Sequence, residues 1–230
     1  MRSNEFVSYH TQLFPKAWIG KKMRHRVRYR LLKIADFFIK NLDIPDLLVV
    51  DIVLTGSMAN YNWTQYSDFD IHVITRFDTI ACPDLAGTMF KSKKSLWNDQ
   101  HNILVFGHEA ELYVQDEKET HHSGGVYSLL RDKWITRPAY NPPDVDNAAV
   151  NHKVIDLENR INLVLDSDAD SEHISNLTAR LRKMRQAGLE SGGEFSVENL
   201  AYKTLRNRGY IDRLYKVANQ RQDRALSLGQ

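Results

Sequence analysis

The stretch LTGSMANYNWTQYSDFDIHVIT, residues 54–75, carries the features that decide the fold. It begins at the end of an apolar, β-branched run, residues 46–55, which predicts a strand that is buried on both faces. Gly56 ends that strand. The stretch closes on DFDIHVIT, where polar and apolar residues at first alternate, so a second strand is expected with Asp68 and Asp70 on the same face.

The surrounding sequence predicts helices and further strands. Apolar spacing predicts one long basic helix over residues 15–41, a helix over 84–98, strands over 102–106 and 109–114, a hairpin from Gly124 to residue 135, and a proline-containing loop over 136–147. Strand signals then stop, and residues 148–165, 171–189 and 196–226 read as helices, the last one broken near Gly209. We therefore expect an α+β fold: a small mixed sheet with flanking helices over residues 1–137, and an all-helical domain over 138–230.

Composition excludes several classes of protein. The chain has 230 residues, 42% of them hydrophobic, and 31 basic against 29 acidic side chains. Its one cysteine, Cys82, leaves no intrachain disulfide and no cysteine zinc site, so a metal would need oxygen or imidazole ligands. No run approaches the ~20 apolar residues of a membrane span, and no secretory signal is recognisable. We expect a cytoplasmic protein with no membrane partner.

The residues at the two strand ends suggest phosphate and metal chemistry. Gly56 allows close approach of a ligand to the backbone, and Ser57, at the expected start of a helix, offers a hydroxyl and free N–H groups to a phosphate. Asp68 and Asp70 project from one strand face with Cα atoms roughly 6.5–7 Å apart, and two such carboxylates require a cation. Mg²⁺ prefers oxygen ligands and phosphate oxygens, and a pair of ions can activate a hydroxyl and hold a leaving phosphate.

A two-metal site needs a third carboxylate from a neighbouring strand. Glu111 fits, because it interrupts the otherwise apolar strand AELYV. Glu109 competes with it on the same face, but it lies at the strand start, where we expect exposure. His72 shares the face of the two aspartates, and a hydrogen bond to a neighbour explains it as well as a part in the site does.

The order Gly-Ser, Asp-x-Asp and then an acid in a later strand resembles the nucleotidyltransferase superfamily typified by DNA polymerase β. The resemblance covers residues 47–115 and is strongest to small phage and bacterial nucleotidyltransferase-like proteins. It implies that Gly56 and Ser57 bind the triphosphate of an NTP such as ATP, and that Asp68, Asp70 and Glu111 coordinate two Mg²⁺ ions, or Mn²⁺ in their place. It also implies that Glu111 helps to deprotonate the acceptor hydroxyl.

These observations favour transfer of a nucleoside monophosphate from NTP to an acceptor hydroxyl, with release of pyrophosphate. Basic helices favour RNA, including tRNA, as the acceptor, while a protein or a small molecule would use the same acids. A non-catalytic module of the same fold, antitoxin-like or RNA-binding, is the alternative from another class; the intact acids count against it. A phosphate hydrolase is disfavoured by the Gly-Ser pair, because a hydrolase does not need to bind a triphosphate.

Overall fold

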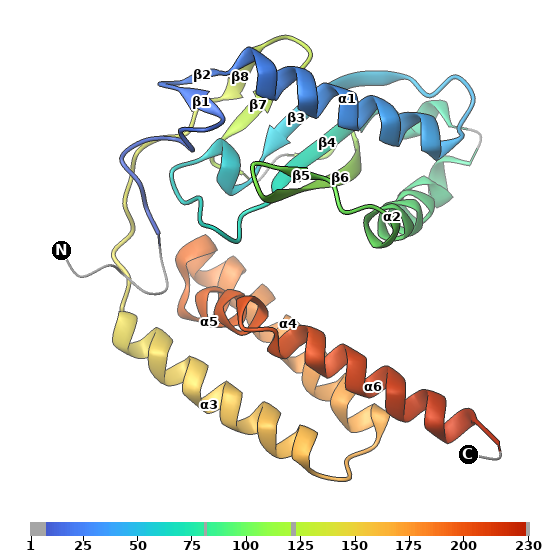
Figure 1. Ribbon diagram of the computed structural model, residues 1–230, viewed down its shortest axis with the longest axis vertical. Helices are drawn as coiled ribbons and strands as arrows, with labels where there is room; N and C mark the ends of the chain where they lie inside the picture. The colour runs from blue at the N-terminus through green and yellow to red at the C-terminus, as the bar shows by residue number, and fades with distance from the viewer. Residues whose placement is uncertain (1–7, 81, 121–122, 229–230) are drawn as a thin grey trace. The chain divides into compact units, whose positions relative to one another are not determined.

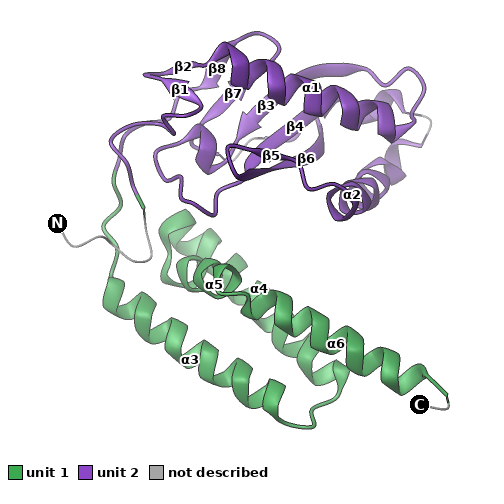
Figure 2. Ribbon diagram, viewed as in Figure 1, with its two compact units in different colours: residues 1–8, 142–230 green, residues 9–141 purple. Residues whose placement is uncertain are grey.

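The computed structural model describes residues 8–80, 82–120 and 123–228. The chain divides into two compact units, one of residues 9–141 and the other of residues 142–230 with the first eight residues (Figure 2). Strands lie in the first of these units, and the second contains helices (Figure 1).

A six-stranded mixed sheet forms the centre of the first unit, with the strand order β5-β6-β4-β3-β7-β8. The strands are β3 (Val49–Thr55), β4 (Phe69–Thr75), β5 (Leu104–Val105), β6 (His108–Asp116), β7 (Val126–Ser128) and β8 (Lys133–Thr136). β4 and β6 run parallel, while the other neighbours are antiparallel. The predicted α+β class with a small mixed sheet is confirmed, and β3 and β4 lie within the two strands expected from residues 46–75.

One face of the sheet carries the main hydrophobic core. Helices α1 (His25–Leu42) and α2 (Pro83–Gln100) contribute their buried side chains to it, together with Phe69, Ile71 and Val73 of β4. Because side chains alternate along a strand, burial of these three residues turns Asp70 to the opposite face, which we call the acidic face.

The prediction of one helix over residues 15–41 is wrong for its first part. Residues 18–23 form a hairpin of β1 (Trp18–Ile19) and β2 (Lys22–Met23), with Gly20 at φ 57°, and α1 starts only at His25. Trp18 and Met23 are cross-strand partners and both are buried. Their apolar side chains match helical spacing, yet a left-handed glycine and the burial of Trp18 favour the turn.

The second unit consists of α3 (Asn147–Asp166), α4 (Ser171–Gly192), α5 (Val197–Asn207) and α6 (Tyr210–Leu226). The break expected near Gly209 is present, with that residue at φ 78°, and Ser196 caps α5 by accepting a hydrogen bond from Asn199 N.

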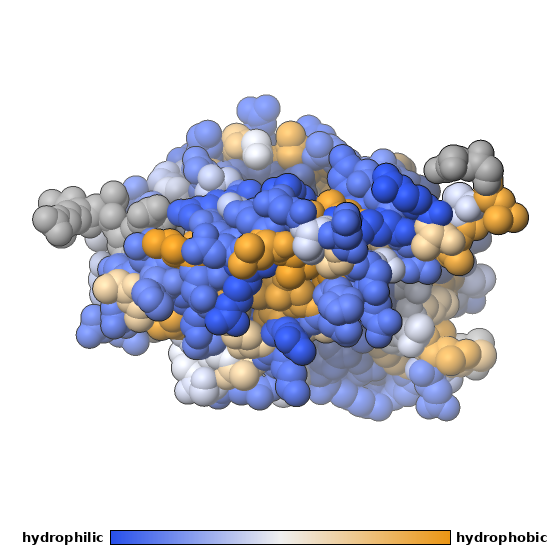
Figure 3. Space-filling view, turned by 90° about the horizontal axis from the view of Figure 1, so that it is seen from below, coloured by the Kyte–Doolittle hydropathy of each residue, from blue (hydrophilic) through white to orange (hydrophobic). Residues whose placement is uncertain are grey.

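Over the residues that the structure describes, no helix combines the length and the apolar character needed to cross a membrane. Hydrophilic residues predominate in the view of Figure 3, and hydrophobic residues form several smaller groups among them.

Candidate active site

The register of β4 against β6 brings two of the predicted acids together. In this parallel pair Asp70 is the partner of Glu111, and His72 is the partner of Tyr113. Neighbouring strands lie roughly 4.8 Å apart, so the carboxylates of Asp70 and Glu111 project side by side on the acidic face. Glu109, the competing acid, is exposed and pairs with Leu104 of β5 instead.

Gly56 lies directly against one of these acids. Its backbone has φ 69° and ψ −160°, and a Cβ atom added there would overlap Oδ2 of Asp70. Its N–H donates to Ser123 Oγ at 3.1 Å. The residue after β3 must therefore be glycine for the Asp70 carboxylate to keep its place against the backbone. This contact explains the glycine of the Gly-Ser pair.

Ser57 does not begin an α-helix. Residues Ser57–Ala59 form a single 3₁₀ turn, so the helix N-terminus expected there as a phosphate site is absent. The Ser57 hydroxyl donates to Ser67 Oγ at 2.7 Å, and Ser67 Oγ accepts from Thr64 N at 2.9 Å. These bonds join the end of β3 to the residue before Asp68, so Ser57 ties together the two ends of the connecting loop.

Asp68 directly precedes β4 and is half-buried. The preceding carbonyl, Ser67 O, accepts from His108 Nδ1 at 2.7 Å, which ties this part of the loop to the start of β6. The pKa of the Tyr113 phenol depends on all three predicted acids, Asp68, Asp70 and Glu111. Burial and the negative charges of these acids raise the pKa of Tyr113 far above its ordinary value.

Tyr113 and Lys94 complete the site, and neither was predicted. The Tyr113 hydroxyl donates to Glu111 Oε2, which fixes one oxygen of that carboxylate. The Lys94 ammonium lies over the Tyr113 ring, 3.4 Å from its centroid. Burial lowers the pKa of Lys94, while the charges of Glu111 and Asp70 oppose the shift. In the sequence Lys94 belongs to the run KSKK, which reads as a solvated helix face.

His72 is held by neighbouring side chains. Its Nδ1–H donates to Gln115 Oε1 at 2.7 Å, and its ring stacks on that of Tyr113 with centroids 4.7 Å apart. The explanation by a hydrogen-bonded neighbour is therefore confirmed. His72 nevertheless lies only two residues beyond Asp70, on the same face of β4.

The acids suit a hard cation that is shared with a substrate. The described residues contain no group of three or more His, Cys, Asp or Glu side chains that is already arranged to hold a metal ion. Mg²⁺, however, is commonly bound by one or two carboxylates together with phosphate oxygens and water. Paired Asp70 and Glu111, with Asp68 nearby, supply the oxygen ligands that such an ion takes.

A mixed sheet that presents carboxylates from neighbouring strands beside a Gly-Ser turn defines a domain suited to metal-assisted phosphate chemistry. Residues 32–131 match the family model described as nucleotidyltransferase domain, and this match supports membership of the nucleotidyltransferase superfamily for this part of the chain. The matched segment contains every residue of the predicted site. Searches of curated proteins and of solved structures found no match to the chain.

Proposed function

We propose that the chain is a Mg²⁺-dependent nucleotidyltransferase of the EC 2.7.7 type, which transfers a nucleoside monophosphate from NTP to an acceptor hydroxyl. The observation that carries the proposal is the pairing of Asp70 with Glu111 on parallel strands, with Gly56 against the Asp70 carboxylate. The match to the nucleotidyltransferase domain supports the same reaction type.

Each predicted residue has a role in this reaction. Asp68, Asp70 and Glu111 would hold two Mg²⁺ ions, for which Mn²⁺ could substitute, and Gly56 with Ser57 would position the triphosphate. When bound, the ions neutralise the charge that develops on the phosphates. The chain itself contributes mainly positioning and a preset electrostatic environment.

The transfer balances without a further reactant. The acceptor oxygen forms a bond to the α-phosphorus, and the bond from that phosphorus to the bridging oxygen of the β-phosphate breaks. Pyrophosphate leaves with the electron pair, and the acceptor proton passes to the Glu111 carboxylate. The hydrogen bond from Tyr113 orients this carboxylate, because it engages Oε2 and leaves Oε1 for the reaction.

RNA, including tRNA, is the acceptor that we favour. Exposed basic side chains of α1, among them Arg26, Arg30 and Lys33, are suited to a phosphate backbone. A protein or small-molecule hydroxyl could take the same place beside Glu111.

The test is incorporation of label from each α-labelled NTP, with Mg²⁺, into RNA, protein and small-molecule fractions of a cell extract. Glu111→Gln should lower incorporation by at least about 100-fold, the loss typical of removing one group that stabilises transition-state charge. Glu109→Gln is the matched control on the same strand and should keep wild-type incorporation. Equal labelling by both variants, or none by folded wild-type protein, would contradict the proposal and favour the non-catalytic module.

A further inference from the structure

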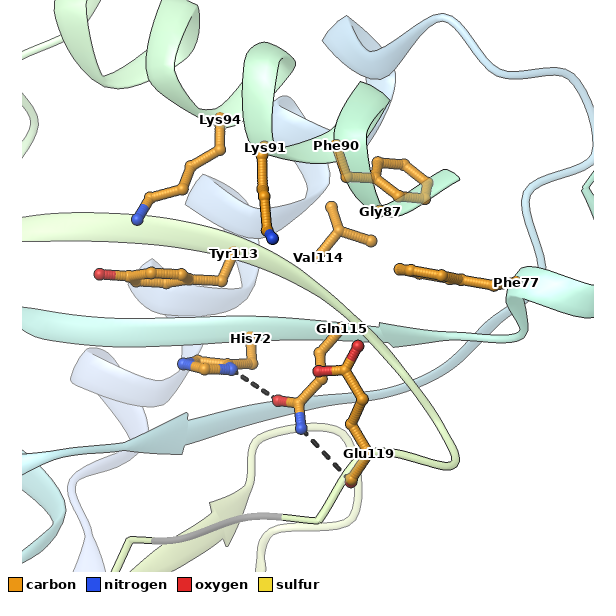
Figure 4. Close-up of a pocket in the computed structure, with 10 residues that line it drawn as sticks. All are labelled: His72, Phe77, Gly87, Phe90, Lys91, Lys94, Tyr113, Val114, Gln115 and Glu119. Atoms are coloured by element: carbon orange, nitrogen blue, oxygen red, sulfur yellow. Dashed lines mark hydrogen bonds between the residues drawn. The ribbon is translucent and has the colours of Figure 1, made fainter. Parts of the chain in front are cut away.

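A pocket of about 290 Å³ lies between α2 and the strand pair β4–β6, entirely within the first unit (Figure 4). Phe90, Lys91 and Lys94 border it from α2, and Tyr113 borders it from β6. Phe77, in the turn that follows β4, lies toward one end. We call it the α2–β6 pocket. Its volume is close to the lower end of the range for small-molecule sites, so it holds one compact ligand.

The pocket adjoins the paired acids through Tyr113. The ring of this residue lines the pocket, while its hydroxyl donates to Glu111 Oε2. On the pocket side the Lys94 ammonium lies over the Tyr113 ring, and it also interacts electrostatically with Asp70. A ligand seated along Tyr113 is therefore one side chain away from the acid expected to receive the acceptor proton.

The lining combines aromatic walls with cationic groups. Phe77 and Phe90 lie with ring centroids 5.2 Å apart, and the Lys91 ammonium points toward the space beside Tyr113 (Figure 4). Aromatic walls suit a planar ring, and a lysine at the border suits a phosphate. Glu119 also lines the pocket and offers a carboxylate to ring amines or hydroxyls.

A fixed polar floor limits how the ligand can lie. The Nδ1–H of His72 donates to Gln115 Oε1, and Gln115 Nε2 donates to Glu119 O at 3.4 Å. The His72 ring stacks on Tyr113 from the other side. Because these contacts order the floor, the pocket is preformed, which lowers the entropic cost of binding.

We propose that the α2–β6 pocket binds the acceptor, and that the acceptor is a nucleotide: a free nucleoside monophosphate or the last nucleotide of an RNA strand. Its base packs against Phe77 at one end of the pocket, its phosphate meets Lys91, and its hydroxyl lies at the Tyr113 end, toward Glu111. The transfer to that hydroxyl rests on the proposed function, whereas the binding does not.

Binding is tested first, without metal. The four nucleoside monophosphates are titrated into the full chain in EDTA, beside the matching nucleosides and inorganic phosphate, and binding is followed by calorimetry. Wild type should bind at least one monophosphate more tightly than its nucleoside. Lys91→Gln should weaken monophosphate binding about tenfold, the low end for a charge-assisted hydrogen bond, and leave nucleoside binding unchanged. Lys133→Gln, an exposed lysine on the opposite edge of the sheet, is the control and should bind as wild type.

Gly87→Leu tests the pocket without removing a contact of the fold. A Cβ at this helical position meets only Phe77, at an ordinary 3.9 Å, and leucine is a better helix former than glycine by most of 1 kcal/mol. The larger side chain fills the pocket and should abolish monophosphate binding while Mg²⁺–NTP binding is retained. Equal monophosphate binding by wild type and Gly87→Leu, or none by folded wild type, would overturn the proposal.

Transfer assays then test the pocket proposal separately from the proposed function. They also distinguish a free nucleoside monophosphate from an RNA strand as the acceptor. Label from NTP in a dinucleotide identifies a free monophosphate as acceptor, and label at an RNA 3′ end identifies the strand; either should be lost in Gly87→Leu. Transfer that is insensitive to Gly87→Leu would overturn the pocket proposal and leave the proposed function standing. Pocket-dependent monophosphate binding without transfer from any NTP would support the nucleotide site and contradict the proposed function.

Discussion

Replacement of Gly56 by alanine should damage the site more than it damages the fold. The residue has φ 69° and ψ −160°, a region that only glycine occupies readily, and a side chain forced into it costs about 1–3 kcal/mol. The new methyl group would also overlap Oδ2 of Asp70. The carboxylate would have to move by about 1 Å, and a misplacement of that size can cost about 100-fold in rate.

Gly20→Ala is the matched control for Gly56→Ala. Gly20 also has a positive φ, 57°, but no atom lies within 4 Å of a Cβ added there. This variant should lose about 1–2 kcal/mol of stability, the cost of a left-handed residue, and should keep its transfer rate per folded molecule. A comparison of the two variants separates backbone strain from displacement of Asp70.

The assay is the transfer rate, normalised to folded protein by urea unfolding, with Mg²⁺–NTP binding as a second readout. We expect a loss of about 100-fold in rate for Gly56→Ala against less than threefold for Gly20→Ala. A wild-type rate in Gly56→Ala would refute the reasoning about Asp70. An equal loss in both variants would show that strain, not the carboxylate, is responsible.

Three further predictions concern stability. Burial and the hydrogen bond that Tyr127 donates to Asp132 raise the pKa of the Tyr127 phenol. The protonated phenol therefore stabilises the fold fully below about pH 10, and this contribution is lost as the pH rises further. Tyr127→Phe should lose less stability than wild type in urea unfolding above pH 10, and the same pH dependence in both proteins would contradict this. Arg28 donates to Leu129 O at 2.6 Å and to Leu130 O at 2.9 Å, so Arg28→Lys should cost about 1–2 kcal/mol in urea unfolding, whereas exposed Arg30→Lys should cost nothing measurable. Ser196→Ala removes the cap of α5 and should cost about 1 kcal/mol, seen as faster hydrogen exchange in its first turn; unchanged exchange would show that the cap contributes little.

Local patterns predicted the strands well, and they failed where tertiary contacts decide. The alternation in DFDIHVIT fixed the faces of β4, because Phe69 and Ile71 are fully buried and Asp70 must then point away. The same kind of spacing misled at residues 15–24. There Trp18 donates through Nε1 to Met58 O, 40 residues away, and stacks on Trp134 at 4.8 Å; no local window contains either partner.

Local patterns likewise predicted some features of the candidate site and missed those that depend on tertiary packing. The spacing of two between Asp68 and Asp70 is visible in the sequence, whereas the pairing of Asp70 with Glu111 depends on the register of strands that are 41 residues apart. Lys94 could not have been predicted. Its place over Tyr113 follows from how α2 packs along β6, and the run KSKK to which it belongs contains no apolar residue that would predict burial.

The hydrophobic core therefore fixes where the acids of the site lie. A slip of one residue in β4 would turn Asp70 into the apolar face and expose Phe69 and Ile71, each of which gains about 1.5–3 kcal/mol from burial. Burying an unpaired carboxylate would add a further cost. Register is thus held by apolar residues that never touch a substrate. Since β6 is parallel to β4, the same register also fixes Glu111 and the pocket wall at Tyr113. A change in the core packing of β4 should therefore reach the paired acids and the α2–β6 pocket together.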